Sequence, residues 1–205
     1  MQGELETALT GAGVSRETLP LLEGYVRLLD DWRQRMNLIG PREMDAIWER
    51  HVLDSAQMAG LTSAECRIVD LGSGAGFPGL VLACEAKTRG GDVTMVESTG
   101  KKCAFLQAVI SELQLPAKVV HARIESAKAE HVDFITARAL APLPKLLGYA
   151  NPWMSQGATA LFFKGERWQE ELTDASDCWT LRHEAIPSRT SERGVILKIE
   201  EAHRV

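Results

Sequence analysis

The sequence of 205 residues lacks the features that mark membrane-spanning, secreted and metal-binding proteins. No apolar run approaches the roughly 20 residues that cross a membrane. The first residues have neither the basic stretch nor the apolar stretch of a signal peptide. The four cysteines form no CxxC pair, and three of them lie in apolar segments, as buried thiols would. We therefore expect a cytoplasmic protein that spans no membrane and holds no metal.

An excess of basic residues is also missing. The formal net charge is −5 at pH 7, and the acidic excess lies in the first third of the chain. A protein of this charge attracts nucleic acid poorly through nonspecific electrostatics, so an RNA partner would need a local basic patch. The sequence shows no internal repeat and no low-complexity segment, and its length suits one α/β domain with a small addition.

The most informative segment is the glycine-rich run DLGSGAGFPG at positions 70–79. It follows the apolar residues Ile68 and Val69 and precedes the apolar run at 80–83. Glycines let a strand turn sharply into a helix and let a ligand approach the bare backbone. The run therefore predicts a nucleotide-type site at the carboxyl end of a parallel strand.

Two kinds of cofactor are compatible with these glycines. Positions 74–79 satisfy GxGxxG, a weak fingerprint of dinucleotide-binding proteins such as NAD-dependent oxidoreductases. Asp70 would repel a pyrophosphate and attract the amino group of S-adenosylmethionine, and Pro78 removes an amide that a pyrophosphate could use. Glu97 closes the next strand-like run, where a carboxylate can accept both hydroxyls of a ribose. These residues favour S-adenosylmethionine, and an NAD-binding oxidoreductase remains the first alternative.

Hydrophobic periodicity divides the chain into two regions. Residues 1–64 are predicted to form a helical N-terminal extension, with apolar stripes over 22–36 and 44–56 that pack on the rest of the protein. In residues 65–205, strands are expected near 67–72, 92–97, 117–121, 132–138 and 157–163, and helices near 77–87, 100–114, 142–154 and 167–175. Two further strand-like runs, 179–186 and 194–199, have no helix between them and indicate an antiparallel hairpin.

This order predicts a Rossmann-like, doubly wound α/β sheet that is mostly parallel and ends in a C-terminal hairpin. Such a sheet is typical of class I S-adenosylmethionine-dependent methyltransferases. A plain dinucleotide-binding domain does not need the hairpin.

Six segments together resemble one known family. They are RHVLDS at 50–55, VDLGSGAGFPG at 69–79, a Glu-Ser-Thr-Gly-Lys-Lys run leading to Phe-Leu at 97–106, RIE at 123–125, TARAL at 136–140 and FKG at 163–165. Their order and spacing are similar to those of the ribosomal RNA small subunit methyltransferase G family, also called glucose-inhibited division protein B. The resemblance covers nearly the whole chain.

The resemblance implies methyl transfer from S-adenosylmethionine, with S-adenosylhomocysteine as product, to N7 of a single guanine. The guanine belongs to 16S ribosomal RNA, so the partner is that RNA or the small ribosomal subunit, and we expect the enzyme to be a monomer. The resemblance also implies cofactor contacts, at Gly72, Phe77, Ile124, Glu125 and Arg138.

Residues of the glycine-rich run and Glu97 complete the expected cofactor-binding set, which is Asp70, Gly72, Gly74, Gly76, Phe77, Glu97, Ile124, Glu125 and Arg138. Arg138 and Lys164 end the fourth and fifth strand-like runs, where the methyl acceptor should lie, so both are candidate catalytic residues. The candidates for the RNA and acceptor pocket are His51, Asp54, Lys101 and Lys102.

Every charged candidate also has a structural interpretation. Arg138 could form a salt bridge to Asp133 or Glu125, and a lysine at a strand end such as Lys164 is usually solvated. His51 could be a core histidine, and Asp54 could pair with Arg50, four residues earlier on the same helix. Lys101 and Lys102 begin a helix, where cations oppose the helix dipole, so they are expected to be solvated or to face phosphate.

Two motifs used by other nucleobase methyltransferases are absent. The chain has no Asn/Asp-Pro-Pro-aromatic run for gripping an amino nitrogen, and no cysteine in a Pro-Cys or Thr-Cys setting for attack on a pyrimidine carbon. Guanine N7 needs neither, because it carries a lone pair and no proton. The lack of an obvious general base therefore fits N7. A noncatalytic RNA-binding or ribosome-binding module is the second alternative, against which the intact Asp70, glycine loop and Glu97 argue.

Overall fold

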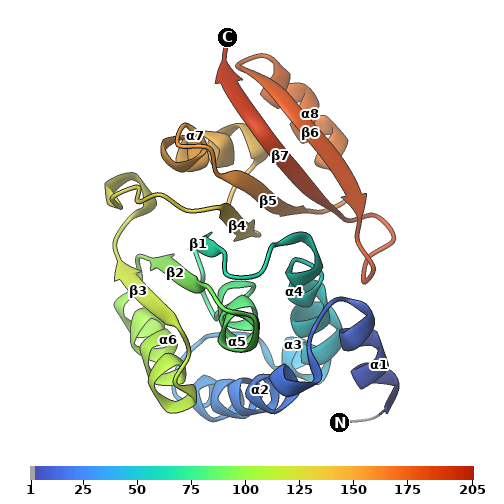
Figure 1. The fold of residues 1–205 in the computed structure, drawn as a ribbon, viewed down its shortest axis with the longest axis vertical. Helices are drawn as coiled ribbons and strands as arrows, with labels where there is room; N and C mark the ends of the chain where they lie inside the picture. The colour runs from blue at the N-terminus through green and yellow to red at the C-terminus, as the bar shows by residue number, and fades with distance from the viewer. Residues whose placement is uncertain (1–2) are drawn as a thin grey trace.

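The computed structural model describes residues 3–205 and contains one seven-stranded sheet with helices on both faces (Figure 1). The strands are β1 (Arg67–Leu71), β2 (Asp92–Glu97), β3 (Ala117–His121), β4 (Phe134–Arg138), β5 (Thr159–Lys164), β6 (Trp179–Pro187) and β7 (Val195–Arg204). They lie in the order β3-β2-β1-β4-β5-β7-β6. β1 to β5 pair in parallel, and β7 runs antiparallel to both β5 and β6. The predicted doubly wound sheet with a C-terminal hairpin is confirmed.

The helices agree well with the prediction after residue 65 and less well before it. They are α1 (Gly3–Gly11), α2 (Leu19–Arg33), α3 (Pro41–Asp45), α4 (Asp54–Ala56), α5 (Gly79–Arg89), α6 (Gly100–Leu113), α7 (Leu143–Met154) and α8 (Trp168–Ser176). Short turns η1 (Arg16–Thr18), η3 (Ala59–Leu61) and η4 (Ile124–Ser126) are 3-10 helices, and η2 (Trp48–Leu53) is a π-helix. The first two residues of the predicted helical extension lie outside the described residues.

Both N-terminal apolar stripes depart from single helices. α2 ends at Arg33, so Met36, the last residue of the first stripe, lies in the turn that follows. The second stripe is divided among α3, the π-helix η2 and α4. Hydrophobic periodicity alone does not distinguish one long α-helix from helical segments joined through a π-helical turn. The i, i+3 and i, i+4 spacing of apolar residues changes little when one turn widens from α to π.

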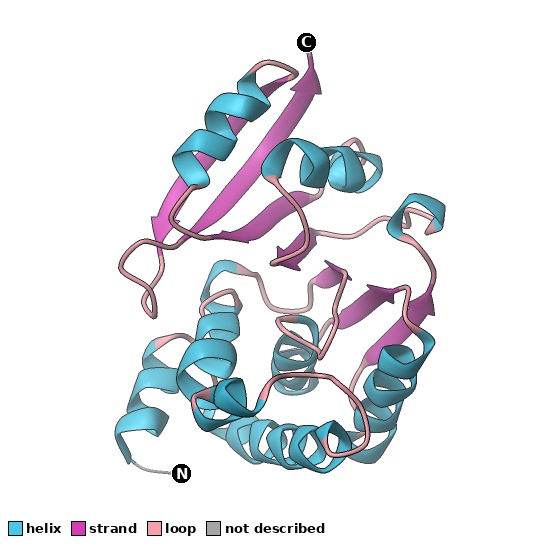
Figure 2. Ribbon diagram, turned by 180° about the vertical axis from the view of Figure 1, so that it is seen from behind, coloured by secondary structure: helices cyan, strands magenta, loops and turns pink. Residues whose placement is uncertain are grey.

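The two faces of the sheet have separate apolar cores. On one face, Tyr25 of α2, Leu82 of α5 and Phe105 of α6 belong to one cluster, which thus joins the N-terminal helices to the sheet. On the other face, α7 and α8 cover β5 to β7, as Figure 2 shows from behind. Neighbouring residues of β5, Leu161 and Phe162, belong to different clusters, as expected where side chains alternate across a strand.

Residues 3–205 contain no helix that is both long and apolar enough to cross a membrane. Cys66, Cys84 and Cys103 are buried free thiols, as three cysteines were expected to be, and Cys178 is an exposed free thiol.

Candidate active site

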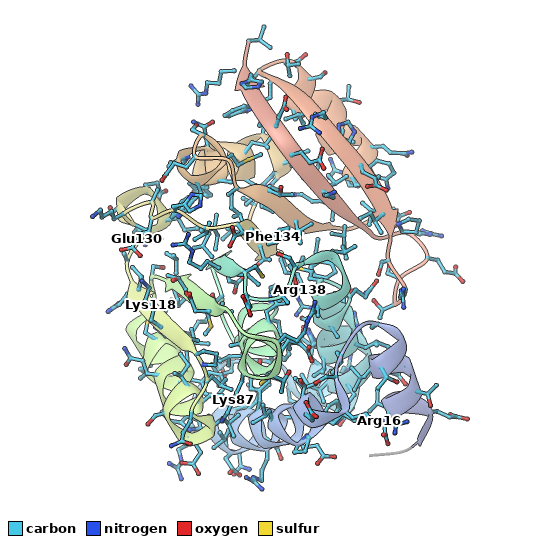
Figure 3. All side chains as sticks on the ribbon, viewed as in Figure 1. Arg16, Lys87, Lys118, Glu130, Phe134 and Arg138 are labelled. Atoms are coloured by element: carbon cyan, nitrogen blue, oxygen red, sulfur yellow. The ribbon has the colours of Figure 1, made fainter. Side chains whose placement is uncertain are left out.

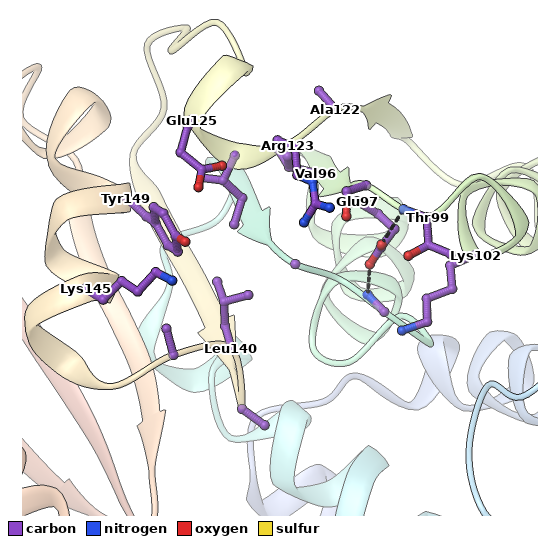
Figure 4. A pocket seen from close by; sticks show the side chains of 16 residues that line it. Val96, Glu97, Thr99, Lys102, Ala122, Arg123, Glu125, Leu140, Lys145 and Tyr149 are labelled. Atoms are coloured by element: carbon purple, nitrogen blue, oxygen red, sulfur yellow. Dashed lines mark hydrogen bonds between the residues drawn. The ribbon is translucent and has the colours of Figure 1, made fainter.

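A cavity of about 430 Å³ opens at the carboxyl ends of β1, β2 and β4 (Figure 4). This edge is where doubly wound sheets bind their ligands. The residues that line it are Gly72, Gly74, Val96, Glu97, Ser98, Thr99, Lys102, Ala122, Arg123, Ile124, Glu125, Ala139, Leu140, Ala141, Lys145 and Tyr149. The structure therefore brings five of the expected cofactor residues to one cavity: Gly72, Gly74, Glu97, Ile124 and Glu125.

The glycine loop reaches this cavity through backbone conformations that favour glycine. Gly72 has φ of +72° and Gly74 has φ of +57°, both in the left-handed region. A Cβ atom on Gly72 would come within 2.6 Å of the Leu140 side chain, which lines the same cavity. A side chain at this position would therefore fill the space that a ligand needs.

Glu97 is fixed against the glycine loop by two backbone amides. Its Oε2 atom accepts a hydrogen bond of 2.9 Å from the amide of Gly74, and its Oε1 atom accepts one of 2.7 Å from the amide of Thr99 (dashed lines in Figure 4). Burial by itself raises the pKa of Glu97, but these amides hold that pKa below its ordinary value. The side chain is thus an oriented carboxylate, and each oxygen retains a lone pair for a hydroxyl donor.

The opposite wall of the cavity is partly apolar. Ile124 of η4 and Leu140 after β4 contribute aliphatic surface, while Glu125 and Tyr149 contribute polar atoms beside it (Figure 4). Lys145 lies with its ammonium 5.5 Å from the ring centre of Tyr149. A wall with aliphatic surface beside polar groups suits a heteroaromatic ring that hydrogen bonds at its edge.

Asp70 lies beneath the glycine loop and does not line the cavity. Its side chain is buried, and Oδ1 accepts a hydrogen bond of 2.9 Å from the hydroxyl of Thr136. Burial raises the pKa of Asp70 to about 6, against hydrogen bonds that lower it. The position differs from the one expected of a residue that attracts a cofactor amino group, because the carboxylate turns into the protein. Gly76 and Phe77 likewise lie outside the cavity lining.

Arg138 belongs to a second group of side chains next to the loop. Its Nη1 atom donates to Asp54 Oδ2 at 3.3 Å and to the Arg50 carbonyl at 3.1 Å, and Nη2 donates to His51 Nδ1. The guanidinium carbon lies 5.3 Å from the ring centre of Phe77. Figure 3 shows Arg138 beside α4, between the sheet and the N-terminal helices.

The salt bridges considered as structural alternatives for Arg138 and Asp54 are not the ones that the structure shows. Arg138 pairs with Asp54, which lies in a distant part of the sequence, and not with Asp133 or Glu125. Asp133 instead accepts the backbone amide of Arg67 at 2.7 Å. Asp54 likewise pairs with Arg138 and not with Arg50, which contributes only its carbonyl.

His51 is a neutral acceptor in this group. Burial and the guanidinium of Arg138 lower the pKa of His51 to about 4. Its ring centre lies 5.1 Å from that of Phe77. Nδ1 therefore accepts from Arg138 while Nε2 carries the proton. The three hydrogen bonds of Arg138 leave two of its five N–H groups without a partner among the described residues.

Lys164 is not solvated. The side chain is buried, and its ammonium donates to Glu171 at 2.6 Å and to the Ala141 carbonyl at 2.9 Å. Lys164 and Glu171 line another cavity, of about 290 Å³, which shares residues 139–141 with the cavity beside Glu97. Lys164 and Arg138 thus end neighbouring strands, but the structure gives their side chains different partners.

Lys101 and Lys102 lie at a basic groove of about 510 Å³ between the end of α2 and the start of α6. Its lining residues are Arg33, Gln34, Arg35, Met36, Asn37, Thr99, Lys101 and Lys102. Thr99 and Lys102 also line the cavity beside Glu97, so groove and cavity adjoin. Arg33 is paired with Asp30 at 2.6 Å, whereas Arg35 is exposed.

Sequence reasoning did not select several residues that the fold brings to these sites. Tyr149 and Lys145 reach the cavity from α7. Only Thr136 and Leu140 had a sequence signal, because both belong to the TARAL segment. Within residues 3–205, no group of three or more His, Cys, Asp or Glu side chains could hold a metal ion.

Comparison with known proteins identifies related sequences over almost the full length. A family model described as "rRNA small subunit methyltransferase G" matches residues 18–196. A ribosomal RNA small subunit methyltransferase G from Hyphomonas neptunium is 53% identical over 196 residues, which cover 96% of this chain and 94% of the relative. The protein of the same name from Paramagnetospirillum magneticum is 45% identical over 200 residues, with 97% and 96% covered.

Solved structures show the same fold at low sequence identity. A SAM dependent methyltransferase from Aquifex aeolicus superposes with a TM-score of 0.57 at 15% identity, covering 79% of this chain and 94% of that one. The structure of M. jannaschii TYW2 in complex with AdoMet gives a TM-score of 0.57 at 15% identity, with 76% of each chain covered. The fold is that of class I S-adenosylmethionine-dependent methyltransferases, and the predicted cofactor agrees with these findings.

Proposed function

Because the chain belongs to the rRNA small subunit methyltransferase G family, we propose that it methylates N7 of one guanine in 16S ribosomal RNA with S-adenosylmethionine. The observation that carries the cofactor assignment is the anchored carboxylate of Glu97 beside the glycine loop. Its position at the carboxyl end of β2 is the one in which a carboxylate accepts the hydroxyls of a ribose.

The residues of the cavity fit this cofactor. Glu97 would hold the ribose, and Ile124 and Leu140 would cover the faces of the adenine, with Glu125 at its polar edge. Gly72 and Gly74 have no side chains, so the rest of the cofactor could approach the backbone of the loop. When bound, S-adenosylmethionine supplies a methyl group on a positively charged sulfur, which a lone pair can displace.

The protein's own part in the reaction is orientation. Guanine N7 has a lone pair and no proton, so no side chain has to remove one. Nitrogen, methyl carbon and sulfur must be aligned and water excluded, and such alignment can contribute several kcal/mol, up to roughly 7–11 in ideal cases. Arg138 suits this task, because its two remaining N–H groups form a fixed fork that can hold guanine O6 or a carboxylate. For Lys164, held by Glu171, we propose a contact with the acceptor across the neighbouring cavity.

Mapping of labelled methyl groups tests the proposal. The pure protein is incubated with isotope-labelled S-adenosylmethionine and either naked 16S ribosomal RNA or small subunits. We expect one labelled 7-methylguanosine. A label on another atom or on another nucleotide would refute the assignment to N7, and binding of NAD in place of S-adenosylmethionine would favour the oxidoreductase alternative. A noncatalytic module would bind RNA and transfer no label.

A flat pH profile is expected for the chemical step. Guanine N7 needs no base, and His51, with a pKa of about 4, does not titrate near neutral pH. The single-turnover rate at saturating RNA and cofactor should therefore change little over roughly pH 7–8.5, above the pKa of about 6 of buried Asp70. A tenfold rise per pH unit that disappears in a folded His51→Gln variant would show that His51 acts as a base, and would favour an acceptor that loses a proton.

The same histidine makes a testable contribution to stability at acidic pH. The pKa of His51 is about 4 in the folded protein, below the roughly 6.5 of an unfolded chain, so protonation favours unfolding. The contribution of His51 to the free energy of unfolding should thus fall by about 1–2 kcal/mol between about pH 6.5 and 4, after allowance for partial exposure. Buried Asp70, whose pKa is raised to about 6, changes the stability in the opposite direction in this window, so the contribution of His51 is the difference between the wild type and a variant without the imidazole. In His51→Asn, whose Oδ1 can still accept from Arg138, denaturant titrations should show this part of the pH dependence removed. An equal pH dependence in both proteins would contradict the assignment.

We propose that the basic groove holds RNA phosphates next to the cofactor. Arg35→Ala combined with Lys101→Ala should weaken RNA binding and reduce the slope of log affinity against log salt by roughly 1–2. Fluorescence anisotropy with a 16S fragment over a salt series measures both values. A matched control, Lys87→Ala with Lys118→Ala, changes the net charge equally but away from the groove (Figure 3). Equal slopes for the two double variants would show that only net charge matters.

A further inference from the structure

The loop between β6 and β7 contacts the helical N-terminal region at the Arg138 group. Thr190 Oγ1 donates to Asp54 Oδ1 at 2.6 Å. One residue earlier, the amide of Arg189 donates to Gln57 Oε1 at 2.6 Å. The tip of the C-terminal hairpin is therefore attached to α4 and to the residue that follows it, although more than 130 residues separate these segments.

Asp54 connects this loop to the arginine. One carboxylate oxygen, Oδ1, accepts its shortest hydrogen bond from Thr190 and a longer one, of 3.2 Å, from Gln57 Nε2. The other oxygen, Oδ2, accepts from Arg138 at 3.3 Å. The side chains of Arg138 and Asp54 are only 16% and 15% exposed, so solvent screens this pair weakly. The bond from Thr190 is short and the ion pair is longer, so the orientation of the carboxylate depends chiefly on its hydroxyl partner.

We propose that Thr190 is a positioning residue for methyl transfer, acting through Asp54 on the guanidinium of Arg138. Without the bond from Thr190, Oδ1 of Asp54 keeps only the longer contacts from Gln57 Nε2, at 3.2 Å, and Ser188 Oγ, at 3.5 Å. The terminal torsion of the aspartate is soft, so the carboxylate can then rotate. Rotation moves Oδ2 away from Nη1 of Arg138, and the fork then loses one of the three bonds that fix its plane. The C-terminal hairpin thereby sets the orientation of a residue at the end of β4. The inference rests on the proposed function, because it assigns to Arg138 a role at the methyl acceptor.

Two variants at one position separate positioning from packing. Thr190→Val keeps the shape of the side chain and removes the donor, whereas Thr190→Ser keeps the donor. We expect Thr190→Val to lower the single-turnover rate about tenfold, the effect of losing a hydrogen bond to a charged group. Cofactor affinity should be unchanged, and Thr190→Ser should restore most of the rate. Thr180→Val, on the same hairpin and exposed, is the matched control and should retain the wild-type rate.

A double-mutant cycle tests the route through Arg138. If Thr190 acts through the guanidinium, Thr190→Val should lower the rate in the wild type and have little further effect in Arg138→Lys. An equal reduction in both backgrounds would overturn the proposal, and so would a Thr190→Val protein that is less stable but transfers methyl at the wild-type rate. Ser188 Oγ lies 3.5 Å from Asp54 Oδ1 and can replace the lost donor, so the cycle is repeated with Ser188→Ala.

The identity of the methylated atom is measured separately. Methyl transfer to an atom other than guanine N7 would refute the proposed function, while the dependence of the rate on Thr190 could still be present. N7 methylation with additive effects of Thr190→Val and Arg138→Lys would leave the proposed function intact and reject Thr190 as a positioning residue.

Discussion

Arg138→Lys should lower the single-turnover rate of methyl transfer by about one to two orders of magnitude at saturating RNA and cofactor. Lysine retains the positive charge and can still pair with Asp54. It cannot reproduce the planar fork that reaches Asp54, the Arg50 carbonyl and His51 and leaves two further N–H groups without a partner among the described residues. Loss of a hydrogen bond to a charged or developing-charge group costs about 1.5–3 kcal/mol, which corresponds to this range of rates.

The stability of the same variant distinguishes function from structure. We expect a loss in free energy of unfolding of about 1 kcal/mol, because the ion pair is partly retained. Arg182→Lys is the matched control, since Arg182 also forms a forked pair, with Glu200 and Glu201, on the exposed hairpin. It should leave methyl transfer unchanged. Normal activity of Arg138→Lys together with a large loss of stability would show that the Arg138 pair is only a structural salt bridge.

The parts of the molecule that sequence predicted well are those determined by local signals. The glycine loop, the alternating strands and helices after residue 65, and Glu97 at the end of β2 each depend on neighbouring residues. In a parallel sheet, topology then brings the strand ends to one edge without further information. This explains why Gly72, Glu97 and Glu125 were correctly expected to lie close together.

The parts that sequence did not predict depend on contacts between distant segments. Asp54 meets Arg138 and Thr190 from parts of the chain that no periodic pattern connects. Lys164 was expected to be a catalytic residue, with a solvated strand end as the alternative, and no sequence pattern indicated its buried ion pair with Glu171 of α8. Asp70 was expected to face a ligand, but the alternation of side chains in β1 directs it beneath the loop, toward Thr136 of β4. In each case the sequence indicated the element that carries the side chain, but not the direction or the partner of that side chain.

Glu97→Ala should weaken the binding of S-adenosylmethionine and S-adenosylhomocysteine by about 1.5–3 kcal/mol, or roughly 10- to 150-fold. In the folded protein the carboxylate is ionised, because the amides of Thr99 and Gly74 hold its pKa below the ordinary value in spite of burial. An ionised carboxylate that already has a fixed orientation can accept ribose hydroxyls without further ordering. Isothermal titration calorimetry with the pure protein should show one site for either ligand and none for NAD.

Glu97→Ala also removes the acceptor of two backbone amides, so it disturbs the glycine loop as well as the ribose contact. A control variant tests whether the loss of any carboxylate that accepts a backbone amide beside β1 is enough to weaken cofactor binding. Asp133→Ala removes the acceptor of the Arg67 amide at the opposite end of β1, outside the cavity. Glu97→Ala should lose about 1–3 kcal/mol of stability for amides left without their partner, and Asp133→Ala should lose less, because its bond to Arg67 is exposed. Only Glu97→Ala should lose cofactor affinity. If both variants bind S-adenosylhomocysteine like the wild type, Glu97 does not hold the ribose, and its carboxylate serves only to fix the glycine loop.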